Sequence, residues 1–72
     1  MDTSFLKKLW NSIHRELQET WPGLTQADID YIYGDKERLI EVIQKRERLS
    51  PHDAAQEVQD FLEHLSMTRN IA

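Results

Sequence analysis

Apolar residues recur at every third or fourth position along this chain, which is the spacing of one face of an α-helix. Two proline-containing turns and one glycine interrupt the pattern, at Pro22-Gly23, Gly34 and Ser50-Pro51. The spacing therefore predicts four amphipathic helices, which are expected over residues 3–20, 26–33, 36–47 and 51–67. No segment alternates with the period of a strand, so the predicted fold class is all-α.

The predicted helix boundaries follow from short-range capping chemistry. Thr25 and Asp28 have the spacing of a capping box, and Asp35 can cap the next helix. Ser50-Pro51 places a serine at the cap position and a proline at the first helical position, which is a strong start signal. Gly34 is expected to be the left-handed residue that closes the second helix.

A chain of 72 residues can build one small hydrophobic core. The residues expected to face that core are Leu6, Leu9, Trp10, Ile13, Leu17, Trp21, Ile29, Ile32, Tyr33, Leu39, Ile40, Val42, Ile43, Ala54, Val58, Phe61, Leu62 and Leu65. Short loops between amphipathic helices predict a compact four-helix bundle that forms a single domain over 1–72. Its core is expected to extend over about residues 3–66, followed by a frayed tail at 68–72.

Composition narrows the classes of function. The net charge of −4 argues against nucleic acid and against anionic membranes, since contacts to phosphate need an excess of Lys and Arg. No stretch approaches the roughly 18 apolar residues of a membrane helix, and residues 1–9 do not read as a signal peptide. The absence of cysteine suits a reducing cytoplasm, where we expect the protein to act.

No catalytic, cofactor-binding or metal site is predicted. The three histidines, His14, His52 and His64, lack convergent partners, although Asp60 and His64 have the spacing of a helical pair. The aspartates near the second helix are better explained as caps and surface residues than as paired catalytic carboxylates. We therefore expect a non-enzymatic protein with no cofactor and no small-molecule substrate.

Arg46 is the most informative polar residue, because it falls within the apolar stripe of its helix. A guanidinium in that position must be paired or must extend into water, and Asp28 is the candidate partner. An alternative interpretation groups Lys45, Arg46 and Arg48 as a basic patch for an acidic partner.

Tyr31 points away from the predicted core face. Together with Tyr33, Ile40 or Phe5 it could form an exposed apolar patch that recruits another protein or mediates self-association.

A set of residues spread over most of the chain carries a family resemblance. They are Trp10, Trp21, Leu24, Thr25, Asp28, Ile29, Ile32, Gly34, Leu39, Ile43, Gln44, Arg46, Ser50, Ala55, Val58 and Phe61. With them the chain resembles the CsbD-like family of small bacterial general stress proteins. Members tend to carry glycine where Glu41 stands, and an aromatic residue and glycine at Glu47-Arg48, so this chain is a divergent member.

The resemblance implies two helical hairpins packed crosswise, similar to the sterile-alpha-motif architecture. It also implies a role in stress, and it assigns no functional residue. Two functions remain open: a protein-binding or adaptor module, and a DNA-associated protein that uses the Gly34 hairpin. Asp35 argues against the second, since its carboxylate follows the only glycine of that turn.

Overall fold

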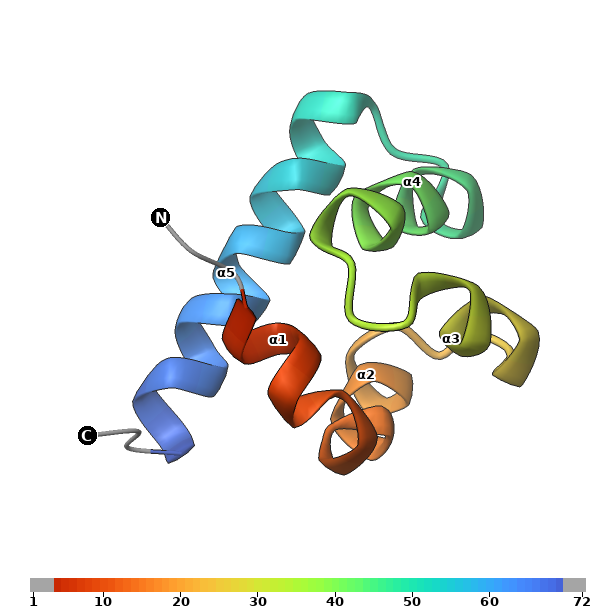
Figure 1. The fold of residues 1–72 in the computed structure, drawn as a ribbon. Helices are drawn as coiled ribbons and strands as arrows, with labels where there is room; N and C mark the ends of the chain where they lie inside the picture. The colour runs from red at the N-terminus through yellow and green to blue at the C-terminus, as the bar shows by residue number, and fades with distance from the viewer. Residues whose placement is uncertain (1–3, 70–72) are drawn as a thin grey trace.

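The computed structural model describes the backbone of residues 4–69 and the side chains of residues 6–67. Within that range the chain forms five α-helices and one 3-10 turn, and no strand (Figure 1). The elements are α1 (Ser4–Leu9), η1 (Trp10–Ser12), α2 (His14–Thr20), α3 (Gln26–Ile32), α4 (Lys36–Glu47) and α5 (Pro51–Arg69). The all-helical prediction is confirmed. α5 continues two residues beyond its predicted end, and positions 70–72 of the expected tail lie outside the described residues.

The first predicted helix is not continuous, and this prediction was wrong. Ser12 donates a hydrogen bond from Oγ to the carbonyl oxygen of Leu9 at 2.8 Å, which diverts that acceptor from the helical ladder. Ile13 then leaves helical geometry, with φ −112° and ψ 9°. The chain changes direction here, so that α1 and α2 are separate helices with η1 between them.

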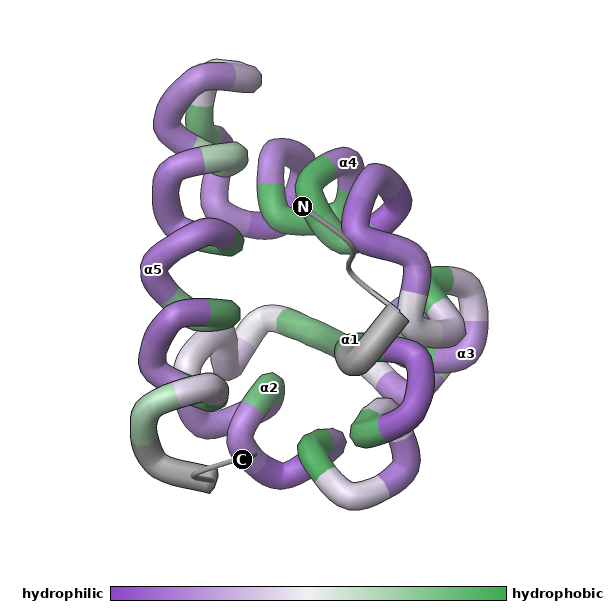
Figure 2. Tube along the Cα trace, turned by 60° about the vertical axis from the view of Figure 1, so that its left-hand side comes forward, coloured by the Kyte–Doolittle hydropathy of each residue, from purple (hydrophilic) through white to green (hydrophobic). Residues whose placement is uncertain are grey.

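α5 is the longest element and runs along one side of the molecule (Figure 1). Its most extensive helix–helix contact is with α4, and α3 and α4 pack as a hairpin. Figure 2 shows that α5 turns its hydrophobic side toward the other helices and its hydrophilic side away from them. The helices therefore share one core between α5 and the remaining elements.

The core contains nearly all the residues predicted for it, and every residue in it is apolar. Its members are Leu6, Trp10, Ile13, Leu17, Trp21, Leu24, Ile29, Ile32, Leu39, Val42, Ile43, Ala54, Val58, Phe61, Leu62 and Leu65. Leu9 and Ile40 are half-buried against it. The prediction for Tyr33 was wrong, since this residue is 66% exposed, whereas Leu24 in the loop before α3 is buried and was not predicted.

The predicted caps are present. Thr25 and Asp28 form a reciprocal capping box, Asp35 accepts from two amides at the start of α4, and Ser50 accepts from the amide of Asp53. The end of α3 differs by one residue from the prediction. Tyr33, with φ 45°, is the left-handed cap, and Gly34 follows with φ 79°.

Candidate interaction surface

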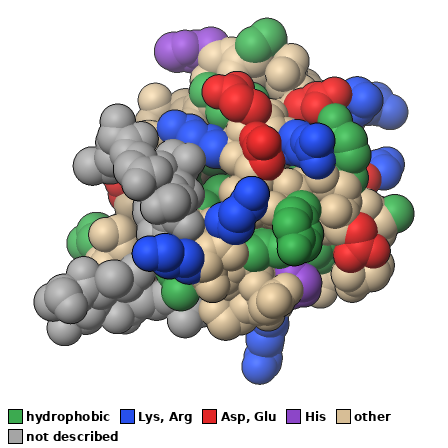
Figure 3. All heavy atoms as spheres, in the orientation of Figure 1, with side chains coloured by type: hydrophobic (Ala, Val, Ile, Leu, Met, Phe, Trp, Pro, Cys, Tyr) green, Lys and Arg blue, Asp and Glu red, His purple; other side chains and the backbone are tan. Residues whose placement is uncertain are grey.

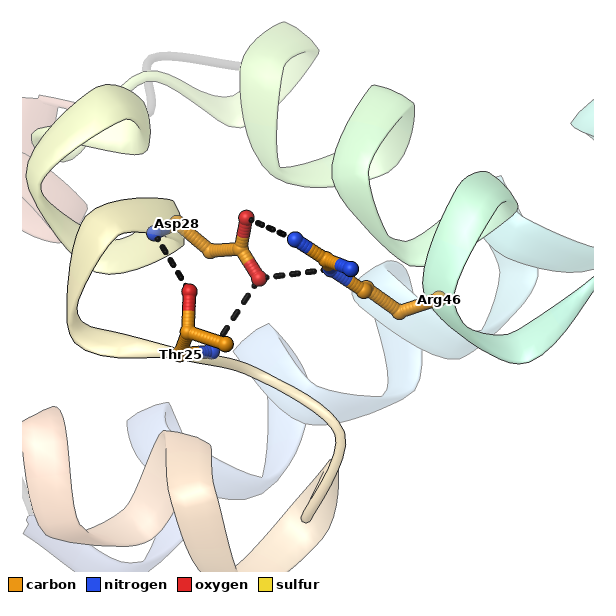
Figure 4. Close-up of polar contacts among 3 residues, drawn as sticks. All are labelled: Thr25, Asp28 and Arg46. Carbon is orange, nitrogen blue, oxygen red and sulfur yellow. Dashed lines mark hydrogen bonds and ion pairs between the residues drawn. The ribbon is translucent and has the colours of Figure 1, made fainter.

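Arg46 and Asp28 join α4 to α3 through a two-pronged contact (Figure 4). Nε and one terminal nitrogen of Arg46 donate to the two carboxylate oxygens of Asp28, at 2.7 and 2.9 Å. Asp28 also accepts from the amide of Thr25, so one carboxylate serves both the cap and the ion pair. The predicted partner of Arg46 is confirmed.

This contact shifts both ionisation equilibria. The hydrogen bond from Arg46 lowers the pKa of Asp28, with help from the Thr25 amide and against the opposing effect of burial. The same hydrogen bond raises the pKa of Arg46. Arg46 is thus paired with a carboxylate of its own chain. The other two residues of the predicted basic patch, Lys45 and Arg48, are exposed and do not pair with Asp28.

Tyr31 is held in place on the surface by two neighbours on α4. Its hydroxyl donates to Oε1 of Glu41 at 2.8 Å, and the guanidinium of Arg38 lies 5.1 Å from the ring centroid. Arg38 also donates to the main-chain oxygen of Tyr31 at 3.0 Å. The hydrogen bond to the Glu41 carboxylate raises the pKa of Tyr31. Tyr31 is 47% exposed, which confirms the prediction that it points away from the core. Its contacts with Arg38 and Glu41, which were not predicted, hold the ring in place.

Tyr33, two positions after Tyr31 in the chain, occupies a strained position. A left-handed conformation is uncommon for a bulky residue, and its ring is the more exposed of the two tyrosines. The ammonium of Lys7, on α1, lies 5.9 Å from the centroid of this ring. We call Lys7, Tyr31, Tyr33, Arg38 and Lys45 the tyrosine surface; Lys45 joins it because it lines a shallow hollow with Tyr31.

The structure corrects the prediction for one other residue of this patch, Ile40. Ile40 is half-buried against the core and lines a different groove, between α4 and α5. The side chain of Phe5 lies outside the described residues.

Gly34 is explained by packing. It is buried, and a Cβ atom at this position would lie 2.7 Å from the Cα of Lys7. The absence of a side chain at Gly34 therefore allows α1 to approach the hairpin, and the backbone of Gly34 faces protein.

The face drawn in Figure 3 intersperses basic and acidic side chains, unlike the continuous basic surface that phosphate binding needs.

In the described residues no group of three or more His, Cys, Asp or Glu side chains could hold a metal ion, although Glu57, Asp60 and His64 line one shallow pocket. His14 is half-buried with its ring edge-on to Trp10, at a centroid distance of 5.7 Å. His52 and His64 are exposed at opposite ends of α5.

Glu57 has a partner that the sequence reasoning missed. It accepts a hydrogen bond from Nε1 of Trp21 at 2.9 Å, across 36 positions of sequence. The available signal that Glu57 flanks the core was its position four residues before Phe61, which was predicted to be in the core. In the structure Phe61 packs against Trp21 with the ring centroids 4.9 Å apart.

Comparison with known proteins identifies the family. The chain is 32% identical over 65 residues to the UPF0337 protein PA4738 of Pseudomonas aeruginosa, across 90% of this chain and the whole of that protein. The chain belongs to the UPF0337 family. A second UPF0337 protein, NE2439 of Nitrosomonas europaea, is 28% identical over 61 residues, which span 85% of this chain and 65% of that protein.

UPF0337 is the CsbD-like family, so the resemblance seen in the sequence is confirmed at this level. No family model matches this UPF0337 chain, and no solved structure matches it either. None of the helices in residues 4–69 is long and apolar enough to cross a membrane.

Proposed function

We propose that this UPF0337 chain is a non-enzymatic protein-binding module of the bacterial stress response, acting in the cytoplasm through the tyrosine surface. The stress context comes from the resemblance to CsbD-like proteins. The sterile-alpha-motif-like crossing of two hairpins stays a prediction and is not needed for the proposal.

The observation that carries the proposal is the placement of Tyr33. A non-glycine residue in this backbone region costs about 1–3 kcal/mol, and a tyrosine residue that is 66% exposed buries too little area to offset much of that cost. Glycine or asparagine would suit the left-handed cap better. A tyrosine that weakens the fold at an exposed position is best explained by contacts outside it.

Tyr31 supports the same interpretation. Tyrosine and arginine are enriched among residues that dominate binding energy, and a ring already fixed by Arg38 and Glu41 loses little freedom when it is covered. Tyr31 is therefore a preorganised anchor on the α3–α4 hairpin, and Tyr33 follows it two positions later.

The non-enzymatic part of the proposal rests on the placement of the polar side chains. The histidines lie on α2 and at the two ends of α5, while Asp28 and Asp35 are engaged as caps. General acid–base chemistry needs such groups within hydrogen-bond reach of one substrate atom.

The experiment compares binding by matched variants. Immobilised full-length chain is exposed to extract from stressed bacterial cells, and the retained proteins are compared among wild type, Tyr31→Ser with Tyr33→Asn, and the surface control Gln18→Asn. Asparagine keeps the left-handed cap, so the tyrosine variant is expected to fold. We expect one or more proteins to be retained by wild type and by the control and lost by the tyrosine variant. Equal retention by all three would contradict the proposal.

A further inference from the structure

We propose that the tyrosine surface binds the outer face of α5 of a second copy of this chain, so that copies associate head to tail. This inference rests on the proposed function, because it assigns an occupant to the same surface. It is drawn from the distribution of charge over the described residues.

The charge of the chain is segregated. Residues 4–48 contain eight Lys and Arg and eight Asp and Glu, whereas residues 51–67 contain four carboxylates and no Lys or Arg. The four carboxylates are Asp53, Glu57, Asp60 and Glu63, all exposed. The outer face of α5 therefore carries negative charge that no cation on the same stretch of helix balances.

The hydrogen-bond partners of these carboxylates leave that charge in place. Asp60 accepts from the amide of Gln56 at 3.0 Å, and Glu63 accepts from the amide of Gln59 at 3.2 Å. Glu57 accepts from the indole of Trp21. All three donors are neutral. Gln56 and Gln59 stand four residues from their carboxylates, and at this helical spacing a lysine would form an ion pair.

The tyrosine surface offers the complementary charge. The ion pairs among the described residues are Arg15–Glu19 and Arg46–Asp28, so Lys7, Arg38 and Lys45 have no carboxylate within 4.0 Å there. Glu41 and Asp35 lie nearby and keep their negative charge, since the Tyr31 hydroxyl and the α4 amides that donate to them are neutral. The three cations therefore exceed these two carboxylates by one. Two of these three cations, Lys7 and Arg38, lie over exposed aromatic rings, so the surface combines positive charge with apolar area.

The two faces cannot meet within one molecule. α3 and α5 lie on opposite sides of the fold (Figure 1), and the hydrophilic side of α5 points outward (Figure 2). A contact between unlike faces is heterologous, and it leaves one free face at each end of a pair. Association should therefore continue beyond a dimer as the protein concentration rises.

The expected strength is modest. Each exposed ion pair contributes little, and exposed charges are screened from each other beyond about 8 Å at physiological salt. Association should be visible at high protein concentration in about 20 mM salt and be lost in about 0.5 M salt.

Sedimentation velocity on the full chain tests the inference with two charge reversals. The first reverses the tyrosine surface, by Lys7→Glu with Arg38→Glu, and the second reverses α5, by Asp60→Lys with Glu63→Lys. The control, Arg15→Glu with Arg48→Glu, changes the net charge by the same amount as the first reversal but lies outside the tyrosine surface. Circular dichroism and urea unfolding check that each variant folds.

The wild-type mean mass should rise above the 8.6 kDa monomer with concentration at low salt, and the control should behave likewise. Each reversal alone should be monomeric. Mixing the two should restore open association with the two variants alternating, because the two unchanged faces are complementary to each other and so are the two reversed faces. Combining both reversals in one chain should restore open association as well.

Two results would overturn the inference: a monomeric wild type at low salt, or a mixture of the two reversals that stays monomeric. A monomeric wild type that still retains a foreign protein through Tyr31 and Tyr33 would overturn the second copy as occupant and leave the proposed function standing. Loss of both the self-association and the tyrosine-dependent retention would overturn both.

Discussion

Arg46, near the end of α4, holds both carboxylate oxygens of Asp28 in the first turn of α3, at 2.7 and 2.9 Å. Because the contact lowers the pKa of Asp28, folding favours the ionised form. The resulting stability is fully present above the unfolded-state pKa of about 3.9 and is lost as pH falls through the lower folded-state value.

Asp28→Asn should therefore flatten the acid side of the stability profile. The wild type should lose more stability than the variant between about pH 5 and pH 2, measured as urea midpoints at each pH. Asp30→Asn is the matched control, since Asp30 bonds only a glutamine amide. Parallel profiles for wild type and Asp28→Asn would show that the ion pair does not couple to folding.

Trp21→Ala should remove a large part of the stability of the fold. Trp21 is 2% exposed and packs on Phe61, and truncation of such a residue costs about 3–5 kcal/mol. That is a large share of the stability expected for 72 residues, so Trp21→Phe provides a milder second variant. Chemical unfolding gives the free energies. A loss below about 1 kcal/mol for Trp21→Ala would be inconsistent with this packing.

Gly34→Ala and Gly23→Ala should differ although the chemical change is the same. At Gly34 the new methyl group would meet the Cα of Lys7 at 2.7 Å with φ at 79°, so we expect a loss of about 2 kcal/mol or more. At Gly23 the atom nearest to the new methyl group would be Oε2 of Glu47 at 3.4 Å, at the far end of a flexible side chain, and φ is not positive, so the effect should be small. Thermal or urea unfolding of the two variants decides the matter; equal midpoints would mean that α1 does not pack on the hairpin as described.

Glu41→Gln should lower the pKa of Tyr31. The carboxylate accepts the phenolic hydrogen bond and repels the phenolate, and a neutral amide removes that repulsion. Tyrosinate absorbance can be titrated in a Tyr33→Phe background so that Tyr31 alone reports. Glu37→Gln is the control, and an inflection that Glu41→Gln leaves unmoved would rule out the Tyr31–Glu41 contact in solution.

The sequence predicted the features that local chemistry decides. The caps at Thr25, Asp35 and Ser50 involve residues within three positions of each other, so their signals survive in any fold. Arg46 could be paired with Asp28 because its place in an apolar stripe demanded a partner. Tyr31 could be placed outside the core from its helical phase alone.

The errors arose where tertiary structure or a one-residue shift decides the outcome. The stripe through Leu6, Trp10, Ile13 and Leu17 keeps its spacing across the break at η1, so periodicity could not reveal the break. Tyr33 was assigned to the core because α3 was expected to continue one residue further. The cations over the two rings depend on how α1 and α4 dock, and no local pattern encodes that arrangement.

The glutamine partners of the α5 carboxylates also have an electrical consequence for the molecule as a whole. A body of balanced charge with an acidic flank is a permanent dipole, and its moment points from α5 toward the α3–α4 hairpin. Near a positively charged surface the chain should turn α5 toward that surface and leave its tyrosines facing outward.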